Sequence, residues 1–332
     1  MQNRTAKSQA GIGLIEIMVA MVIGLFLVGG MQQIFSSARL TYRVHEGSAR
    51  MQETGRIALE VIARDIRMAG FWGCASETAN VVNNLNAAGA NYIDFEAGGV
   101  DGVEGGAGVA DSITLRGGND LGEPLQAPYG PAQSSALNIA AGNGLALGDF
   151  ILVSDCTTAD VFQLSNADAD ATGSLAHTTG AGSPGNDNVT NPGCAVGTDH
   201  CLSKIYGADA MVYAADEVEY RLDLPAGDEP MLLRNGEEFL DGVEDLQILY
   251  GQDTDAPGAP GAGVANYYVP ADQVTDMTQV ISVRFAIVVR SEDDSLMGDD
   301  RPTYTVLGDV RTPPDWRLRQ VYTSTVTVRN RL

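Results

Sequence analysis

The residue that most needs a chemical explanation is Glu16, an acid at the start of a long apolar stretch. Residues 17–38 include no charged residue. A helix of that length, at about 1.5 Å per residue, spans roughly 30 Å, the thickness of the hydrocarbon core of a bilayer. A carboxylate in such a helix is costly and usually has a function. The alternative is that Glu16 marks the membrane edge, where an acid suits the positive end of the helix dipole.

The residues before this stretch set its orientation. Residues 1–10 carry Arg4 and Lys7 and no acid. Because basic flanks stay on the cytoplasmic side, we expect a cytoplasmic N-terminus and an exported remainder. A secretory signal would instead end its apolar run at a small-residue cleavage site.

Residues 11–17, Gly-Ile-Gly-Leu-Ile-Glu-Ile, resemble the class III signal of type IV pilins and pseudopilins. The resemblance implies cleavage by a prepilin peptidase between Gly11 and Ile12, methylation of the new N-terminal Ile12, and Glu16 as the fifth mature residue. The family usually has Phe at the position of Ile12 and often Thr at that of Gly13. Since the implied cut precedes the apolar run, the membrane helix survives processing. The ammonium group of Ile12 then lies about one helical turn from Glu16, which makes Glu16 a candidate assembly residue.

Composition restricts the class of function. The 332 residues include 20 Lys and Arg against 43 Asp and Glu, a formal net charge of −23. Affinity for nucleic acids comes chiefly from Lys and Arg, so direct nucleic-acid binding is not expected. The length allows one large or two small globular units beyond the helix. The 39 glycines suit a sheet domain with long irregular loops.

All four cysteines follow the apolar run, in the part expected to be periplasmic: Cys74, Cys156, Cys194 and Cys201. An even number in an oxidising compartment predicts two disulfides, for which three pairings are possible. The short loop between Cys194 and Cys201 favours a local bridge, which leaves Cys74 with Cys156. The competing interpretation is a metal site with His200, but no Cys-x-x-Cys spacing supports it.

The helical pattern continues beyond the membrane stretch. Residues 39–69 contain no proline, and their apolar residues recur close to a helical period. Gly70 and Gly73 then predict the end of the helix. We therefore predict one rod from Ile12 to about Ala69. The expected units are a leader at 1–11, a membrane or filament-core helix at 12–38, an amphipathic continuation at 39–70 and a periplasmic head at 71–332.

Alternating and apolar patterns predict strands in the head at residues 112–116, 149–155, 161–164, 217–223, 231–234, 243–250, 280–290 and 319–329. The run at 280–290 is the strongest and is expected in the centre of its sheet. Residues 75–110, 165–199 and 253–263 have the composition of long loops. One long helix followed by strands predicts an α+β fold, with the helix packed on an antiparallel sheet as in pilins.

Acidic loops and histidines are the remaining candidates for chemistry. Residues 168–173 begin like a calcium loop, with Asp168, Asp170, Thr172 and Gly173, but Thr179 stands where the bidentate Glu belongs. A second acidic cluster consists of Asp293, Asp294, Asp299 and Asp300. The histidines are His45 on the helix and His177 and His200 in polar loops, without a nucleophile motif or phosphate-binding loop. We expect no enzymatic activity, no bound metal and no cofactor.

Short segments narrow the resemblance to the PilW family of minor pilins. They are residues 64–70 with Gly73 and Cys74, residues 153–156 with 160–162, and the closing residues 328–331. The resemblance implies a minor pilin that takes part in initiating type IV pilus assembly and is sited at the pilus tip with other minor pilins. Such pili serve twitching motility, cell adhesion or DNA uptake.

The same resemblance implies partners and location. The partners are other minor pilins and the major pilin, the inner-membrane assembly platform, the prepilin peptidase and a tip adhesin. The chain would cross the inner membrane once, with a cytoplasmic N-terminus and a periplasmic head, and would join the pilus on the cell surface. Two alternatives stay open: a pseudopilin of a type II secretion filament, for which a smaller head is expected, and a tip adhesin or ligand-binding module.

Overall fold

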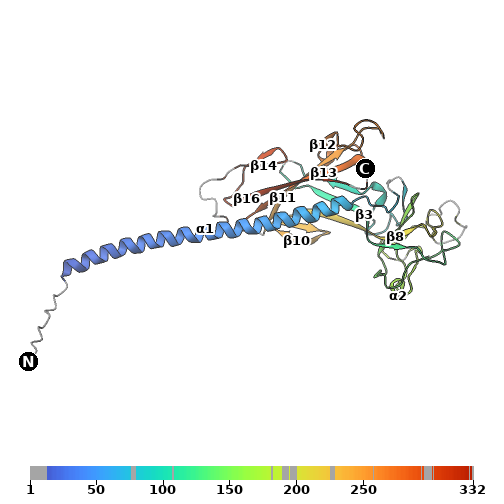
Figure 1. The fold of residues 1–332 in the computed structure, drawn as a ribbon, viewed down its shortest axis with the longest axis horizontal. Helices are drawn as coiled ribbons and strands as arrows, with labels where there is room; N and C mark the ends of the chain where they lie inside the picture. The colour runs from blue at the N-terminus through green and yellow to red at the C-terminus, as the bar shows by residue number, and fades with distance from the viewer. Residues whose placement is uncertain are drawn as a thin grey trace, which may run out of the picture.

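A computed structural model of the chain describes residues 13–75, 80–106, 108–180, 182–188, 194, 200–224, 229–256, 258–292, 294, 301, 303–328 and 330. One long helix projects from a head built of β-strands (Figure 1). Helix α1 (Leu14–Met68) has 55 residues, which corresponds to a rod of about 80 Å. The predicted α+β fold is confirmed, and the observed helix lies within the predicted span from residue 12 to 69.

The first sheet has eight strands in the order β1-β6-β5-β8-β3-β2, with β9 beside β8 and β10 beside β9. All its pairs are antiparallel except β1 with β6, which is parallel. Its strands are β1 (Val81–Asn83), β2 (Val100–Val103), β3 (Ser112–Pro124), β5 (Phe150–Ser154), β6 (Ala159–Gln163), β8 (Met211–Asp223), β9 (Met231–Arg234) and β10 (Glu237–Asp241).

The second sheet is fully antiparallel, in the order β12-β11-β13-β16. Its strands are β11 (Val243–Gln252), β12 (Tyr267–Val269), β13 (Val280–Arg290) and β16 (Arg319–Thr327). The smaller elements are the ribbons β4 (Leu137–Asn138) with β7 (Ser174–Leu175) and β14 (Tyr304–Val306) with β15 (Asp309–Arg311), helix α2 (Ala169–Thr172), and the single turns η2 (Phe95–Ala97), η3 (Ala271–Gln273) and η4 (Met277–Gln279).

Strand β13 has the predicted bounds and lies inside its sheet, between β11 and β16, as predicted. Strands β3 and β8 are longer than predicted, because small residues interrupt their alternating pattern where the two strands pair, with Gly118 opposite Ala215. The chain that leaves α1 crosses β3 at this point, and the Gly118 amide donates to the Phe71 carbonyl at 2.7 Å. The small residues therefore leave room for a close backbone crossing.

Two of the predicted loops contain short elements. Residues 75–110 form β1, η2 and β2, and residues 165–199 form α2 and β7 in their described part. Residues 253–263 contain no helix or strand where they are described. The sequence also failed to predict β10, which forms a hairpin with β9 through Asn235 and Gly236. Both turn residues have positive φ, 55° and 78°, as a two-residue type I′ turn requires.

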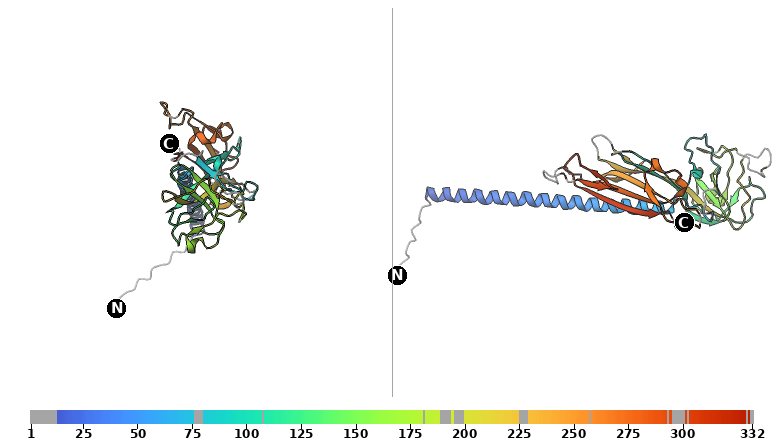
Figure 2. Two further views of the ribbon diagram at one scale, coloured as in Figure 1. Left: turned by 90° about the vertical axis from the view of Figure 1, so that its right-hand side faces the viewer. Right: turned by 90° about the horizontal axis from the view of Figure 1, so that it is seen from above.

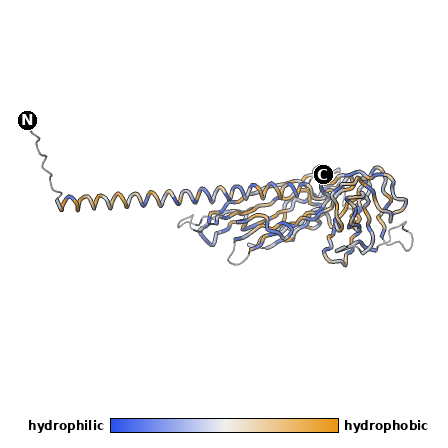
Figure 3. Tube along the Cα trace, turned by 90° about the horizontal axis from the view of Figure 1, so that it is seen from below, coloured by the Kyte–Doolittle hydropathy of each residue, from blue (hydrophilic) through white to orange (hydrophobic). Residues whose placement is uncertain are grey.

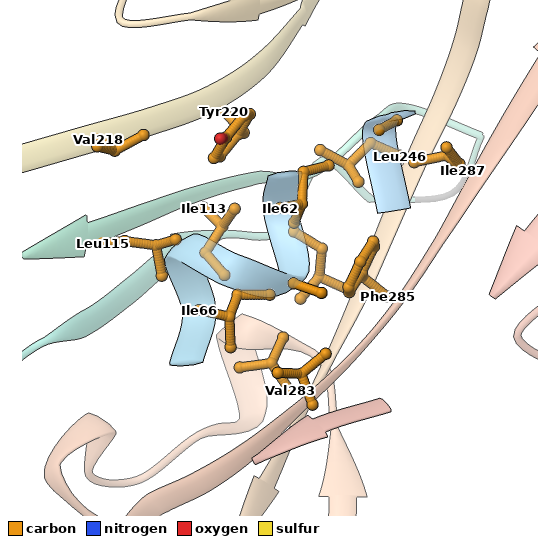
Figure 4. Packing of buried hydrophobic residues seen from close by; sticks show 14 of the residues in the cluster. Ile62, Ile66, Ile113, Leu115, Val218, Tyr220, Leu246, Val283, Phe285 and Ile287 are labelled. Carbon is orange, nitrogen blue, oxygen red and sulfur yellow. The ribbon is translucent and has the colours of Figure 1, made fainter. Parts of the chain in front are cut away.

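The largest core lies where the last five turns of α1 meet both sheets. Buried side chains of α1, including Ile62 and Ile66, pack against Ile113 of β3 and against Val283 and Phe285 of β13 (Figure 4). Two smaller cores lie in the part of the head farthest from the N-terminus, which we call the distal lobe: residues 71–99 and 125–210 with the first residues of β8, including Val212 and Ala215. Figure 2 shows this lobe beyond the end of α1.

Candidate functional site: the exposed half of the helix and its attachment to the head

Helix α1 has two halves with different surroundings. In its first part, residues 14–43, nearly every side chain is exposed, and we call this part the free half. It carries a continuous series of large exposed apolar residues, with Leu14 77% and Phe26 79% exposed. The hydropathy colouring in Figure 3 shows apolar residues concentrated here. The helix is long and apolar enough to cross a membrane, and none of its most apolar window is buried in the head.

Glu16 lies in the first turn of α1 and is the acid of that turn. Its side chain is exposed, and its backbone amide donates to the Gly13 carbonyl at 3.0 Å. Both residues of the expected cleavage site, Gly11 and Ile12, lie outside the described residues, as does the rest of the leader.

The first charge after Glu16 is Arg39, whose guanidinium lies over the ring of Phe35, 4.1 Å from the ring centroid. Tyr42, one turn further on, is 68% exposed. Arginine and tyrosine are the side chains that settle where the apolar core of a bilayer meets water. This pair therefore suits one end of a membrane-spanning segment.

Burial of α1 against the head begins at Met51, the first buried residue of the helix. Its carbonyl accepts a hydrogen bond from the Tyr322 hydroxyl at 3.0 Å. One turn later Gly55 lies against the ring of the same tyrosine, with no space for a side chain. The close approach of helix and β16 at this point requires glycine. We call the part from Val44 to Met68 the seated half.

A polar contact fixes the far part of the seated half. The Tyr220 hydroxyl on β8 donates to the Asp65 carboxylate at 2.6 Å, and Arg234 on β9 donates to the same oxygen at 3.0 Å. Arg234 Nε also donates to the Tyr220 hydroxyl at 3.1 Å. Burial raises the pKa of Tyr220, and the hydrogen bond to Asp65 raises it further, so the phenol remains a donor. This triad joins α1 to the first sheet.

The end of α1 is held by residues distant in sequence. The Asn330 amide donates to the carbonyls of Met68 and Ala69, both at 3.3 Å. The Gly70 amide donates to the Arg116 carbonyl at 2.8 Å, and Gly70 has a φ of +71°. A glycine in the left-handed region ends the helix, as the sequence predicted.

Both disulfides favoured by the sequence are present in the structure, Cys74–Cys156 and Cys194–Cys201. The first joins the segment after α1 to the turn between β5 and β6, across 82 residues. The second closes a loop across seven residues. Both belong to the distal lobe. An ion pair between Lys204 and Asp155 connects the neighbourhoods of the two bridges.

The candidate calcium ligands at residues 168–173 have other partners. Asp168 precedes α2 and accepts from the Asn166 amide at 2.7 Å, and Asp170 accepts from the Gly144 backbone amide at 2.7 Å. Of the second cluster, Asp294 accepts from the Trp316 amide at 2.9 Å, while Asp293, Asp299 and Asp300 lie outside the described residues. Among the described residues, no group of three or more His, Cys, Asp and Glu side chains could hold a metal ion.

His177 and His200 lie outside helices and strands, as predicted, but the structure buries both in the distal lobe. Their Nδ1 atoms lie 2.8 Å apart, and His177 Nε2 lies 3.0 Å from the Ser135 carbonyl. That carbonyl can only accept, so His177 Nε2 carries the proton and His200 Nδ1 donates to His177 Nδ1. His200 Nε2 is then a buried acceptor without a hydrogen-bond partner in the described part of the chain.

Burial lowers the pKa of both histidines, that of His200 to about 3, with a further lowering from His177. Both rings are therefore neutral near pH 7. Sequence reasoning missed this pair because two histidines 23 residues apart in polar loops give no periodic signal. The remaining histidine, His45, lies on α1 as predicted.

The β-rich head holds one half of a helix about 80 Å long and leaves the apolar other half exposed. This arrangement fits a single-pass, helix-anchored protein. Residues 222–330 match the family model of PilW, described as type IV pilus-assembly protein W. The match confirms the predicted resemblance and supports a PilW-family type IV pilus protein. It covers the C-terminal third of the chain, from the end of β8 through β16. Comparison with curated proteins and with solved structures gave no significant match.

Proposed function

We propose that the protein is a minor pilin that takes part in initiating type IV pilus assembly and sits at the pilus tip with other minor pilins. The observation that carries the proposal is the free half of α1. Its exposed apolar surface has no partner in the described part of its own chain. Lipid covers such a surface before assembly, and the apolar helices of neighbouring subunits cover it afterwards. The PilW match of residues 222–330 supports the same conclusion.

The proposal includes the course of the chain. Residues 1–11 are a leader, removed by a prepilin peptidase between Gly11 and Ile12, and the new Ile12 terminus is methylated. Residues 12–38 cross the inner membrane with the N-terminus in the cytoplasm, residues 39–70 continue the helix, and residues 71–332 form the periplasmic head. Two disulfides suit that oxidising compartment. The partners are other minor pilins, the major pilin, the assembly platform and a tip adhesin.

Glu16 has a specific role in this proposal. An unpaired carboxylate among apolar helices costs several kcal/mol, so it needs a cation. Cleavage creates one, the ammonium group of Ile12, within about one helical turn. The pair forms within one chain or between neighbours. Since a neighbour out of axial register leaves both charges unpaired, the pair selects the register of assembly as well as the contact.

Substitution of Glu16 in a deletion strain tests this function. The deletion strain should lose most surface pili, and the wild-type gene should restore them. Glu16→Ala should insert and be processed normally but fail to restore pili, and Glu16→Asp should be intermediate because its charge is kept at shorter reach. Glu53→Ala is the matched control, since Glu53 is an exposed acid on the seated half of the same helix.

Pili per cell are counted by electron microscopy, and the mature N-terminus is determined by intact-mass analysis. A mature chain that still carries Arg4 and Lys7 would refute the pilin function. Normal piliation in the deletion strain together with lost type II secretion would identify a pseudopilin instead. Full piliation by a stably expressed Glu16→Ala chain would show that Glu16 is only a membrane-edge acid.

A further inference from the structure

Strand β16 ends the second sheet and has an unpaired edge. Its nine residues pair with β13 in an unbroken register from Arg319 opposite Arg290 to Thr327 opposite Ser282. On its other side β16 has no strand neighbour in the described part of the chain. Peptide groups along that side are free to pair with another strand.

The hydrogen bonds to β13 show which residues of β16 face outward. The Val328 amide donates to the Ile281 carbonyl at 2.8 Å, and the Ser291 amide donates to the Leu318 carbonyl at 2.9 Å. In an antiparallel pair such bonded residues alternate with residues that turn their peptide groups to the other side. The even-numbered residues of β16 therefore bond β13. Residues 321, 323, 325 and 327 present their N–H and C=O groups at the free edge.

The free edge lies between a covered face and an open one. On the inner face, Tyr322 packs against α1 and Val326 is buried in the main core. On the outer face, Thr323, Thr325 and Thr327 are exposed. The β14–β15 ribbon packs near Val321 and so covers only the beginning of this face.

The other described strands at sheet ends are poor templates by comparison. Strand β10 has a register shift and three acids in five residues, which discourage pairing. Strands β1 and β12 have three residues each, and β2 has four. Residues 320–327 of β16, in contrast, contain no charge, no proline and no register shift. Among the strands described, only β16 is both long and unprotected.

We propose that the free edge of β16 binds an extended strand of a different subunit of the same filament, antiparallel to β16. The partner strand continues the second sheet, in which every described pair is already antiparallel. The proposal rests on the assembly function proposed above, because the partner is a filament subunit.

The direction of β16 excludes a second copy as the antiparallel partner. Tyr322 contacts Met51 near the start of the seated half, and Asn330 contacts Met68 at its end, so β16 runs in the same direction as α1 (Figure 2, the long red strand beside the helix). Two copies anchored in one membrane from the same side have parallel α1 helices and hence parallel β16 strands. The partner is therefore an extended segment that runs toward the membrane.

The surroundings of the edge define the side chains of that segment. Threonines on the outer face pair best across strands with threonine, serine or another β-branched residue. The chain has a net charge of −23, which repels acidic segments. The edge thus selects a neutral or basic, threonine- or valine-rich strand.

Residue-resolved amide hydrogen exchange tests the proposal on the full-length protein. It compares membranes that contain all pilus subunits with membranes in which this protein is expressed alone. In the protein alone, the amides of residues 321, 323, 325 and 327 should exchange quickly, while those of Tyr322, Ser324 and Val326 are protected. With the other subunits present, the odd-numbered amides should slow at least tenfold. Equal exchange of the odd-numbered amides in the two kinds of membrane would overturn the proposal. Protection of these amides in the protein expressed alone would also overturn it, and would indicate that a second copy occupies the edge.

Proline substitution gives an independent measurement. Thr323→Pro removes an outward N–H and leaves every bond to β13, so the head should keep its unfolding midpoint. Piliation should nevertheless fall at least tenfold. Thr323→Ala keeps the N–H and should assemble like the wild type, whereas Ser324→Pro removes a bond to β13 and should destabilise the head.

These outcomes separate the two proposals. A folded Thr323→Pro chain that restores full piliation to a strain otherwise without pili overturns strand binding and leaves the assembly function intact. If the deletion strain keeps its pili, the assembly function fails, and the exchange measurement alone decides whether the edge is occupied. If Thr323→Pro does not fold, the exchange measurement on the unsubstituted protein tests strand binding instead.

Discussion

Gly55 of α1 and the ring of Tyr322 on β16 are in direct contact, and no side chain fits between them. The contact fixes how closely the helix approaches the second sheet, and Tyr322 adds a hydrogen bond to the Met51 carbonyl one turn away. A glycine in the middle of a 55-residue helix is otherwise unfavourable by about 1 kcal/mol relative to alanine. Packing against the sheet therefore outweighs helix propensity at this position.

Gly55→Ala should lower the free energy of unfolding of the head by about 1–3 kcal/mol, because the methyl group forces the helix and Tyr322 apart. Urea unfolding of the full-length protein in detergent, followed by tyrosine fluorescence, measures the change. Gly30→Ala is the matched control, since a Cβ at Gly30 meets nothing within 4 Å. An unfolding midpoint for Gly55→Ala equal to that of Gly30→Ala would contradict this account of the contact.

Tyr220→Phe should destabilise the attachment of α1 to the first sheet by about 1–3 kcal/mol. The substitution leaves the ring in place but removes the hydroxyl that connects Asp65 with Arg234, both partly buried. The urea midpoint of the head provides the measurement. Tyr267→Phe removes the hydroxyl of an exposed tyrosine on β12 and should leave the midpoint unchanged. Equal effects of the two substitutions would rule out a specific role for Tyr220.

The buried histidine pair predicts acid sensitivity of the distal lobe. The pKa of His200 is about 3 in the folded chain and about 6.5 when unfolded, so the unfolded chain binds the proton first as the pH falls. The contribution of His200 to the free energy of unfolding is therefore complete above about pH 6.5. It decreases toward pH 3, by at most about 1.4 kcal/mol per pH unit. Thermal unfolding between pH 7 and 4 measures the slope.

His200→Gln should reduce that slope. Asp111 acts in the opposite direction, because burial raises its pKa to about 6 in the folded chain and stability from this group increases as the pH falls below 6. Comparison of the variant with the wild type cancels the contribution of Asp111. Identical slopes for the two proteins would contradict the assignment of acid sensitivity to the histidines.

Removal of the two disulfides should have unequal effects. Chain entropy predicts a loss of about 4.5 kcal/mol for the bridge across 82 residues and about 2.4 kcal/mol for the bridge across seven. The double variants Cys74→Ser with Cys156→Ser, and Cys194→Ser with Cys201→Ser, isolate each bridge. Their urea midpoints give the order, and a larger loss for the short bridge would show that loop closure does not govern it.

The sequence predicts the regular parts of this molecule well. The helix and β13 were predicted nearly to their ends, because long uninterrupted periodic patterns identify such elements. Strand β10 was missed because Glu237-Glu-Phe-Leu-Asp has the composition of a loop, and only its hairpin with β9 makes it a strand. The free half of α1 was predictable from composition. The histidine pair and the triad at Asp65 were not, since both arise from contacts between residues distant in the chain.

The location of the disulfides also separates two stages of maturation. Both bridges lie in the distal lobe, whereas α1, the second sheet and the segment that matches PilW contain no cysteine. Helix α1 and the second sheet therefore need no oxidant for their own covalent structure, whereas the distal lobe needs thiol oxidation to form its two bridges. Under the proposed export, a cell with impaired disulfide formation would accumulate chains whose distal lobe lacks both bridges while the contacts between α1 and the second sheet are intact.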